Sequence, residues 1–199
     1  MTIDEYLDSI EIPYEERTTA TNNFADENLI SQGRSTGVKL YKGQLISKSG
    51  QLTNILARLY GVSKAAHNEV LISYWVNNKN IHSIFKISES CDDDEILISK
   101  YVANGSLNKY LSDSQTLTWM QRLHICVGVA HALSYLHNDV TVGSNGRSII
   151  HGNIKSSKIL LDDNWEPKLY GFRYSMTAKT GDVHRPSEYW DKSGYRDPT

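Results

Sequence analysis

The chain has 199 residues, with 21 basic and 23 acidic side chains and a formal net charge of −2. This length suits one domain or two small lobes, and no apolar run approaches the ~18 residues that a membrane span needs. The N-terminal segment is acidic and lacks the apolar core of a signal peptide, and no basic stripe indicates nucleic-acid binding. Only Cys91 and Cys126 occur, which is typical of a reducing compartment. We therefore expect a cytoplasmic protein.

The first half of the chain predicts short strands and one helix. Residues 1–27 carry few apolar side chains and predict a leader that packs loosely. Three apolar or alternating runs follow, separated by Gly, Ser and Asn, and they predict antiparallel strands with residues 43–53 as a polar hairpin loop. Apolar residues at helical spacing then predict a helix over 63–76. The expected strands are 29–30, 37–41, 55–59, 81–87 and 95–101.

Residues 91–94 form an acidic turn between the last two of these strands. Three consecutive carboxylates suggest either a metal site or a solvated hairpin tip, and the tip is the more frequent use of such a run.

The clearest predicted helix covers residues 118–137. Thr118 and Gln121 have the spacing of a capping box at its start. Three histidines on it are seven and six residues apart, which does not suit a helical metal pair. An apolar residue recurs every three or four positions and predicts a buried face, formed by Trp119, Leu123, Val127, Ala130, Leu133 and Leu136.

Beyond residue 148, three short apolar pieces at 149–150, 159–161 and 168–170 predict short strands separated by polar loops. The second half of the chain therefore combines one long helix with short extended segments.

The segment HGNIKSSKILLD at residues 151–162 resembles the catalytic loop of protein kinases. More narrowly, it resembles plant receptor-like serine/threonine kinases, whose version is H-R-D-[IV]-K-x-x-N-I-L-L-D. Further stretches agree in order and spacing, and together they cover about residues 18–198. They are 20–24 (the juxtamembrane lead-in), 41–43 (the end of the glycine-rich hairpin), 101–107 (the hinge), 117–123 and 135–137 (the long helix) and 194–198 (the end of the activation segment).

The resemblance implies an α+β, bilobal protein-kinase-like fold. A juxtamembrane-like leader (1–27) would precede a small lobe (28–101) with a five-stranded antiparallel sheet and one helix. Residues 102–199 would form a partial, mostly helical large lobe. Because family members continue beyond this point, we expect either a shortened piece of the domain or a shortened gene product.

The resemblance also implies that the residues for phosphoryl transfer are replaced. Protein kinases need a carboxylate that accepts the substrate proton and two residues that hold Mg²⁺. The catalytic Asp falls on Asn153, whose amide cannot take up a proton near neutral pH, and the preceding Arg falls on Gly152. The two metal-binding residues fall on Lys158 and Gly171, and neither offers a side-chain oxygen. No catalytic position is intact, although His151 and Lys155 of the same loop are kept.

Two rescues remain open. Asp162 or Asp163 would supply metal oxygens, although the resemblance puts them on a turn away from the phosphates. Alternatively, the ammonium groups of Lys155 and Lys158 replace the metal and permit ATP binding without Mg²⁺, unless Lys158 merely fills the vacated space or points to solvent.

The positions that bind the nucleotide in the family also depart from the family pattern. The glycine-rich loop keeps Gly33 and Gly37, with Ser31 for the first family glycine. The strand lysine aligns with Arg58 or Ala57, depending on where one gap is placed. With the helix glutamate, the candidate nucleotide contacts are Gly33, Gly37, Arg58, Glu69 and Lys155.

A kept apolar scaffold with lost polar chemistry is typical of a pseudokinase. We expect a module that binds proteins in receptor-kinase or immune signalling, with no nucleic-acid partner. Its partners would be receptor-like kinases or immune-receptor complexes, which would bring it to the inner face of the plasma membrane. The alternatives are a weak, atypical serine/threonine kinase and a degenerate fragment without a stable function. Candidate phosphoacceptors are Tyr174, Ser175, Thr177, Thr180, Ser187 and Tyr189.

Overall fold

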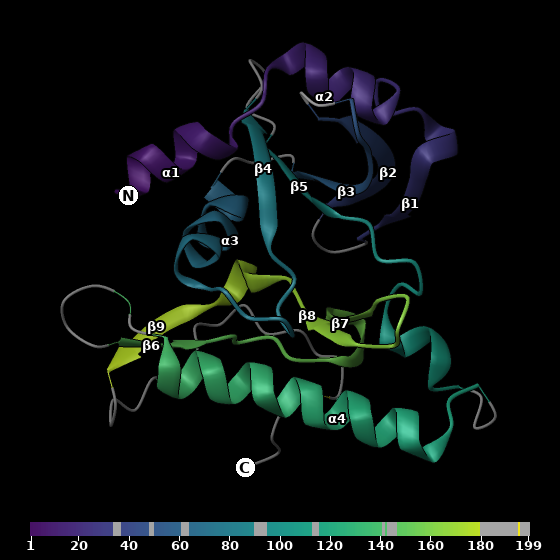
Figure 1. The fold of residues 1–199 in the computed structure, drawn as a ribbon, viewed down its shortest axis with the longest axis vertical. Helices are drawn as coiled ribbons and strands as arrows, with labels where there is room; N and C mark the ends of the chain where they lie inside the picture. Colours follow the sequence, from purple (N-terminus) through teal and green to yellow (C-terminus); the bar gives the residue numbers. More distant parts are fainter. Residues whose placement is uncertain are drawn as a thin grey trace. The chain divides into compact units, whose positions relative to one another are not determined.

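The computed structural model describes residues 1–33, 37–47, 50–60, 64–89, 95–112, 116–140, 142, 147–179 and 195. The chain divides into two compact units, whose elements Figure 1 labels. The first unit comprises residues 1–74 and 83–101, and the second comprises residues 75–82 and 102–199.

The first unit contains a five-stranded antiparallel sheet, as predicted, in the order β1–β2–β3–β5–β4. The hairpin between β2 and β3 is longer than expected, because Ile46 still pairs with Leu52 and Leu45 is buried. The predicted loop of 43–53 is therefore too long, because residues 43–46 and 52–53 belong to the paired strands. The strands are β1 (Leu29–Gln32), β2 (Lys39–Ile46), β3 (Leu52–Tyr60), β4 (Ile84–Glu89) and β5 (Glu95–Lys100).

One face of this sheet packs against α3 (Lys64–Trp75), which agrees with the predicted helix. Ala66 and Val70 of α3 share a core with Leu97 of β5. β4 begins at Ile84 and not at the expected residue 81. Ile81 belongs to the second unit, where it forms an isolated parallel bridge with Leu169. Ser63 and the acidic turn at 91–94 lie outside the described residues.

The leader is not loosely packed, which corrects the expectation from its composition. It forms α1 (Ile3–Ile10), which starts at a Thr2–Glu5 capping box, and α2 (Tyr14–Thr21). Ile12 belongs to a buried cluster with sheet residues, and its N–H donates to the carbonyl of Ile87 at 2.9 Å. A few apolar residues hold these two short helices in place. The average composition of residues 1–27 does not reveal them, because it ignores where the apolar residues lie.

The second unit is built around α4 (Trp119–Ser134), the long green helix of Figure 1, which continues into a π-helical turn, η3 (Tyr135–Asp139). The predicted capping box at Thr118 and Gln121 is confirmed. Two antiparallel ribbons accompany the helix: β6 (Arg147–Ile150) with β9 (Met176–Lys179), and β7 (Ile159–Leu161) with β8 (Pro167–Leu169). Three 3-10 turns complete the described part: η2 (Leu107–Tyr110), η4 (Ser156–Lys158) and η5 (Phe172–Tyr174).

The buried face predicted for α4 is wrong in most of its members. Trp119 is 74% exposed, and Leu123, Val127 and Ala130 are exposed as well. The packed face consists of Ile125, Gly128 and Ala132, followed by Leu136 in η3. Its small residues allow close approach, since a Cβ on Gly128 would clash with the ring of Pro167 in β8. Within the described ranges, no helix is both long and apolar enough to cross a membrane.

Candidate functional site

A buried ion pair links β3 to α3 in the first unit. The Arg58 guanidinium donates from Nη1 to Oε2 of Glu69, and the two residues are only 3% and 4% exposed. The hydroxyl of Tyr60 donates to the other carboxylate oxygen, Oε1, at 2.8 Å. Ala57 lies instead in the hydrophobic cluster with Ile55. Arg58 is therefore the strand residue that reaches Glu69.

Tyr60 was missed by the sequence analysis, although a signal for it existed. It lies two residues after Arg58 on β3, and alternate residues of a strand face the same side. Arg58 and Tyr60 together place one donor on each carboxylate oxygen of Glu69. This arrangement neutralises the guanidinium inside the unit and fixes α3 against β3.

The two candidate phosphate-binding glycines direct their backbone N–H groups into their own loop. Gly33 donates to the carbonyl of Val38 at 2.9 Å, and Gly37 donates to the carbonyl of Gly33 at 3.0 Å. Gly37 has a φ of +67°, which suits glycine. Because both N–H groups already have acceptors within the loop, they are poorly suited to cradling a phosphate in this conformation.

His151 is fully buried and organises the segment that resembles a catalytic loop. Its Nδ1 accepts from the backbone N–H of Asn153 at 3.2 Å, so the hydrogen-bond partners assign the proton to Nε2, which lies 3.2 Å from the carbonyl of Tyr170. The ring also contacts that of Phe172, with centroids 4.8 Å apart. These contacts hold the loop against the chain that follows β8.

Gly152 has no room for the side chain that the resemblance would put there. A Cβ at this position would lie 2.5 Å from the carbonyl oxygen of Tyr174, and the φ of Gly152 is +74°. The hydroxyl of Ser175 donates to the carbonyl of His151 at 3.1 Å next to this contact. An arginine at 152 would therefore require η5 to move.

Lys158 and Gly171, the two positions of the expected metal ligands, are in direct contact. A Cβ on Gly171 would lie 2.8 Å from Nζ of Lys158, so the ammonium occupies the space where a side chain at 171 would begin. Nζ also lies 5.0 Å from the ring centroid of Tyr170, a cation–π arrangement that the sequence analysis did not foresee. Lys158 is therefore half-buried against Gly171 and Tyr170.

These residues do not fit Mg²⁺. The ion prefers oxygen ligands, whereas the two positions offer an ammonium group and a bare backbone. In the part of the chain that the structure describes, no group of three or more His, Cys, Asp or Glu side chains is placed to hold a metal ion. Asp162 is engaged elsewhere: its Oδ1 accepts from the N–H groups of Asn164 and Glu166 at 2.9 and 3.0 Å, and its Oδ2 lies 3.4 Å from Nζ of Lys168.

Lys155 is half-buried, and its carbonyl accepts from the N–H of Lys158 at 2.8 Å. Among the candidate phosphoacceptors, Ser175 is buried and is not accessible to another enzyme in this conformation. Tyr174 and Thr177 are half-buried. Thr180, Ser187 and Tyr189 lie outside the described residues.

Comparisons with known proteins agree with this architecture. Residues 32–198 match the protein kinase domain family. A probable receptor-like protein kinase of Arabidopsis thaliana is 32% identical over 197 residues, which cover 94% of this chain and 22% of that protein. Protein kinase STUNTED from the same plant is 36% identical (82% of this chain, 25% of the relative), and wall-associated receptor kinase-like 6 is 31% identical (90% and 28%).

The chain thus spans about a quarter of the length of these curated relatives. The family match extends over most of the described residues and includes β2 to β5, α3, α4 and the loop around His151. The chain belongs to the protein kinase family, as a member of its plant receptor-like group.

Proposed function

We propose that this chain is a pseudokinase module that acts by binding other proteins and does not transfer phosphate. The observation that carries the proposal is the contact between Lys158 and Gly171, which puts an ammonium group where a metal-binding carboxylate would begin. Phosphoryl transfer depends on Mg²⁺ to neutralise charge on the phosphates. A site that presents an ammonium group and no side-chain oxygen at these two positions disfavours binding of that ion.

The third lost position supports the same proposal. Asn153 replaces the proton acceptor, and a general base contributes roughly 10²–10⁴-fold to such reactions. Two structural contacts are nevertheless kept, since His151 is buried and the Arg58–Glu69 pair is formed. A sequence that keeps the framework and loses three chemical groups favours a role in binding.

The relatives suggest the class of partner. Two of those reported above are receptor-like or wall-associated receptor kinases, so we propose that the chain binds receptor-like kinases or immune-receptor complexes at the inner face of the plasma membrane. The protein's place in the cell would then be cytoplasmic and set by its partners.

A phosphotransfer assay tests the proposal against the alternative of a weak kinase. The purified chain is incubated with radiolabelled ATP and a generic protein substrate, with Mg²⁺ and separately with EDTA. We expect no transfer above that of heat-denatured chain. Transfer that disappears in Lys155→Ala would identify an atypical kinase and overturn the proposal. Co-purification of a receptor-like kinase with the tagged chain is the positive result that a binding module requires.

A further inference from the structure

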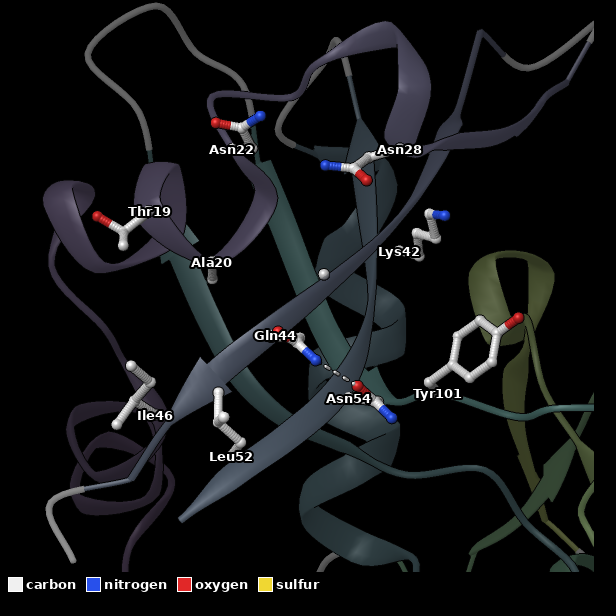
Figure 2. A pocket seen from close by; sticks show the side chains of 11 residues that line it. Thr19, Ala20, Asn22, Asn28, Lys42, Gln44, Ile46, Leu52, Asn54 and Tyr101 are labelled. Atoms are coloured by element: carbon white, nitrogen blue, oxygen red, sulfur yellow. Dashed lines mark hydrogen bonds between the residues drawn. The ribbon is translucent and has the colours of Figure 1, made fainter. Parts of the chain in front are cut away.

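A pocket of about 570 Å³ opens in the first unit beside the β2–β3 hairpin, within the size range of ligand sites in proteins (Figure 2). None of its residues belongs to the positions that replace kinase chemistry. They come from α2 and the segment between α2 and β1, from β2 and β3, and from the residue that follows β5: Thr19, Ala20, Asn22, Asn28, Lys42, Gly43, Gln44, Ile46, Leu52, Asn54 and Tyr101.

Close packing of the leader on β2 builds one wall of this pocket. A Cβ on Gly43 would clash with the carbonyl of Ala20, so α2 lies directly on the strand at this point. Ala20 and Leu45 are buried in the same cluster. The wall is therefore part of the core of the unit and is formed before any ligand binds.

The chemistry of the lining favours an anionic, hydrogen-bonding ligand. Lys42 is the one charged residue among the lining residues, which also include four carboxamides. Within the described part of the chain, the Lys42 ammonium, the Asn54 amide nitrogen and the Tyr101 hydroxyl have no protein acceptor. The Nδ2 groups of Asn22 and Asn28 already donate to Glu27 and to Thr21, which leaves their carbonyl oxygens as acceptors.

The polar and apolar parts of the pocket lie at opposite ends. Figure 2 shows Lys42 and Tyr101 at one end and Ile46 and Leu52 at the other, with the Gln44–Asn54 hydrogen bond of 3.1 Å between them. Ile46 and Leu52 are cross-strand partners, and each is 60% exposed. Lys42 and Ile46 are four residues apart on one face of β2, which corresponds to about 13 Å.

We propose that this pocket binds an extended segment of a partner protein, in which an acidic side chain lies four residues from an aliphatic one. The same 13 Å separates residues i and i+4 of an extended peptide, so the acidic group would reach Lys42 while the aliphatic group covers Ile46 and Leu52. The carboxamides offer the donor and acceptor that match a peptide group. This inference rests on the proposed function, since it names the partner segment that a binding module would hold.

Fluorescence anisotropy with two labelled, capped peptides tests the site on the full chain. The peptides are Glu-Thr-Ser-Thr-Leu and Leu-Thr-Ser-Thr-Glu, because the segment can run in either direction. We expect one of them to bind saturably and to lose about tenfold in affinity when its Glu is replaced by Gln, as for the loss of one charged hydrogen bond.

Variants of the chain locate the contact. Lys42→Ala and Ile46→Ser are each expected to weaken binding about tenfold, whereas Lys39→Ala, on the same strand but outside the pocket, leaves it unchanged. The Gln-containing peptide should be insensitive to Lys42→Ala, because the paired charge is already gone. All three side chains are at least partly exposed, so thermal unfolding should be nearly unaffected and serves as the check on folding.

The inference is overturned if neither peptide binds, or if Lys42→Ala weakens binding no more than Lys39→Ala does. Equal binding of free acetylglutamate would also overturn it, because a small anion would then suffice. The phosphotransfer assay is independent of these measurements, so the site and the proposed function can fail separately.

Discussion

The ammonium group of Lys158 lies beside the backbone of Gly171, in the space that a side chain at position 171 would need. A Cβ on Gly171 would lie 2.8 Å from Nζ, 2.9 Å from Cδ and 3.1 Å from Cε of Lys158. By the family resemblance, Lys158 stands where a residue that gives an oxygen to a metal is expected, and Gly171 provides the space that the lysine fills. The two replacements are therefore structurally complementary.

This complementarity predicts a coupling between the two positions. Gly171→Ala should be destabilised by about 1–2 kcal/mol for a non-glycine residue at positive φ, and by a further ~0.5–1 kcal/mol for displacing Lys158 from the Tyr170 ring. Gly50→Ala is the matched control, since Gly50 has a φ of +79° with nothing within 4 Å. Urea unfolding measures both. In a Lys158→Ala background, Gly171→Ala should cost no more than Gly50→Ala, because only the positive-φ cost remains. A cost at Gly171 that still exceeds the cost at Gly50 would contradict the contact.

Restoring the proton acceptor alone should restore nothing. Asn153→Asp supplies a carboxylate, but the metal-ligand positions stay occupied by Lys158 and Gly171, and groups that act as a unit give non-additive effects. We expect phosphotransfer from radiolabelled ATP to remain at background in this variant. Measurable transfer by the single variant would show that the site does not depend on the two lost ligands.

Restoring both ligands should bring back a response to Mg²⁺. In thermal unfolding with ATP, we expect the wild-type chain to give the same midpoint with Mg²⁺ and with EDTA. The Lys158→Asn/Gly171→Asp double variant should be stabilised by ATP only when Mg²⁺ is present, because oxygen ligands are then available. A Mg²⁺-dependent shift already present in the wild type would contradict the account of the site.

The ion pair of the first unit predicts an asymmetric mutational pattern. Glu69→Ala leaves the Arg58 guanidinium buried without its carboxylate and should cost about 3–5 kcal/mol in unfolding free energy. The double variant Arg58→Met/Glu69→Leu removes both charges and should regain part of this loss. What remains is about 1–3 kcal/mol, because the buried Tyr60 hydroxyl has lost its acceptor. Tyr60→Phe removes one hydrogen bond to a charged group and should cost ~1.5–3 kcal/mol.

Urea unfolding measures this series, with the exposed Lys100→Ala as a control expected within about 0.5 kcal/mol of wild type. If the double variant is as unstable as Glu69→Ala, packing around the pair and not the unpaired charge determines the cost.

Local patterns predicted much of the fold, because strands, α3 and the capping box at Thr118 depend on neighbouring residues. They did not predict that the leader is packed. Ile10 and Ile12 are buried because they contact sheet residues as far as about 75 positions away in sequence, and a local pattern does not contain such contacts. The family resemblance identified Asn153, Lys158 and Gly171 as the replaced positions from the order of residues alone. One alternative that the sequence left open, in which Lys158 fills the vacated space, is the arrangement found against Gly171. The contact of Nζ with the Tyr170 ring was not predicted, since it depends on how η4 approaches the end of β8.

The same limit explains α4, where apolar residues occur on two faces and periodicity does not say which one packs. Gly128 and Ala132 carry little apolar surface, so a hydrophobic pattern gives them little weight. Their small size nevertheless allows the backbone of α4 to lie close to β8. Because α4 packs through its small residues, the large apolar residues Trp119 and Leu123 lie on its exposed face.

Substitutions on the two faces of this helix distinguish the alternatives. Trp119→Gln should stay within about 0.5 kcal/mol of wild type in urea unfolding, because the side chain is 74% exposed. Leu136→Ala should cost ~2–5 kcal/mol, because Leu136 is fully buried and its truncation leaves a cavity. Gly128→Ala should also destabilise, by about 1–3 kcal/mol, since its methyl group would push against Pro167. Equal losses for Trp119→Gln and Leu136→Ala would mean that both faces of α4 are covered in solution.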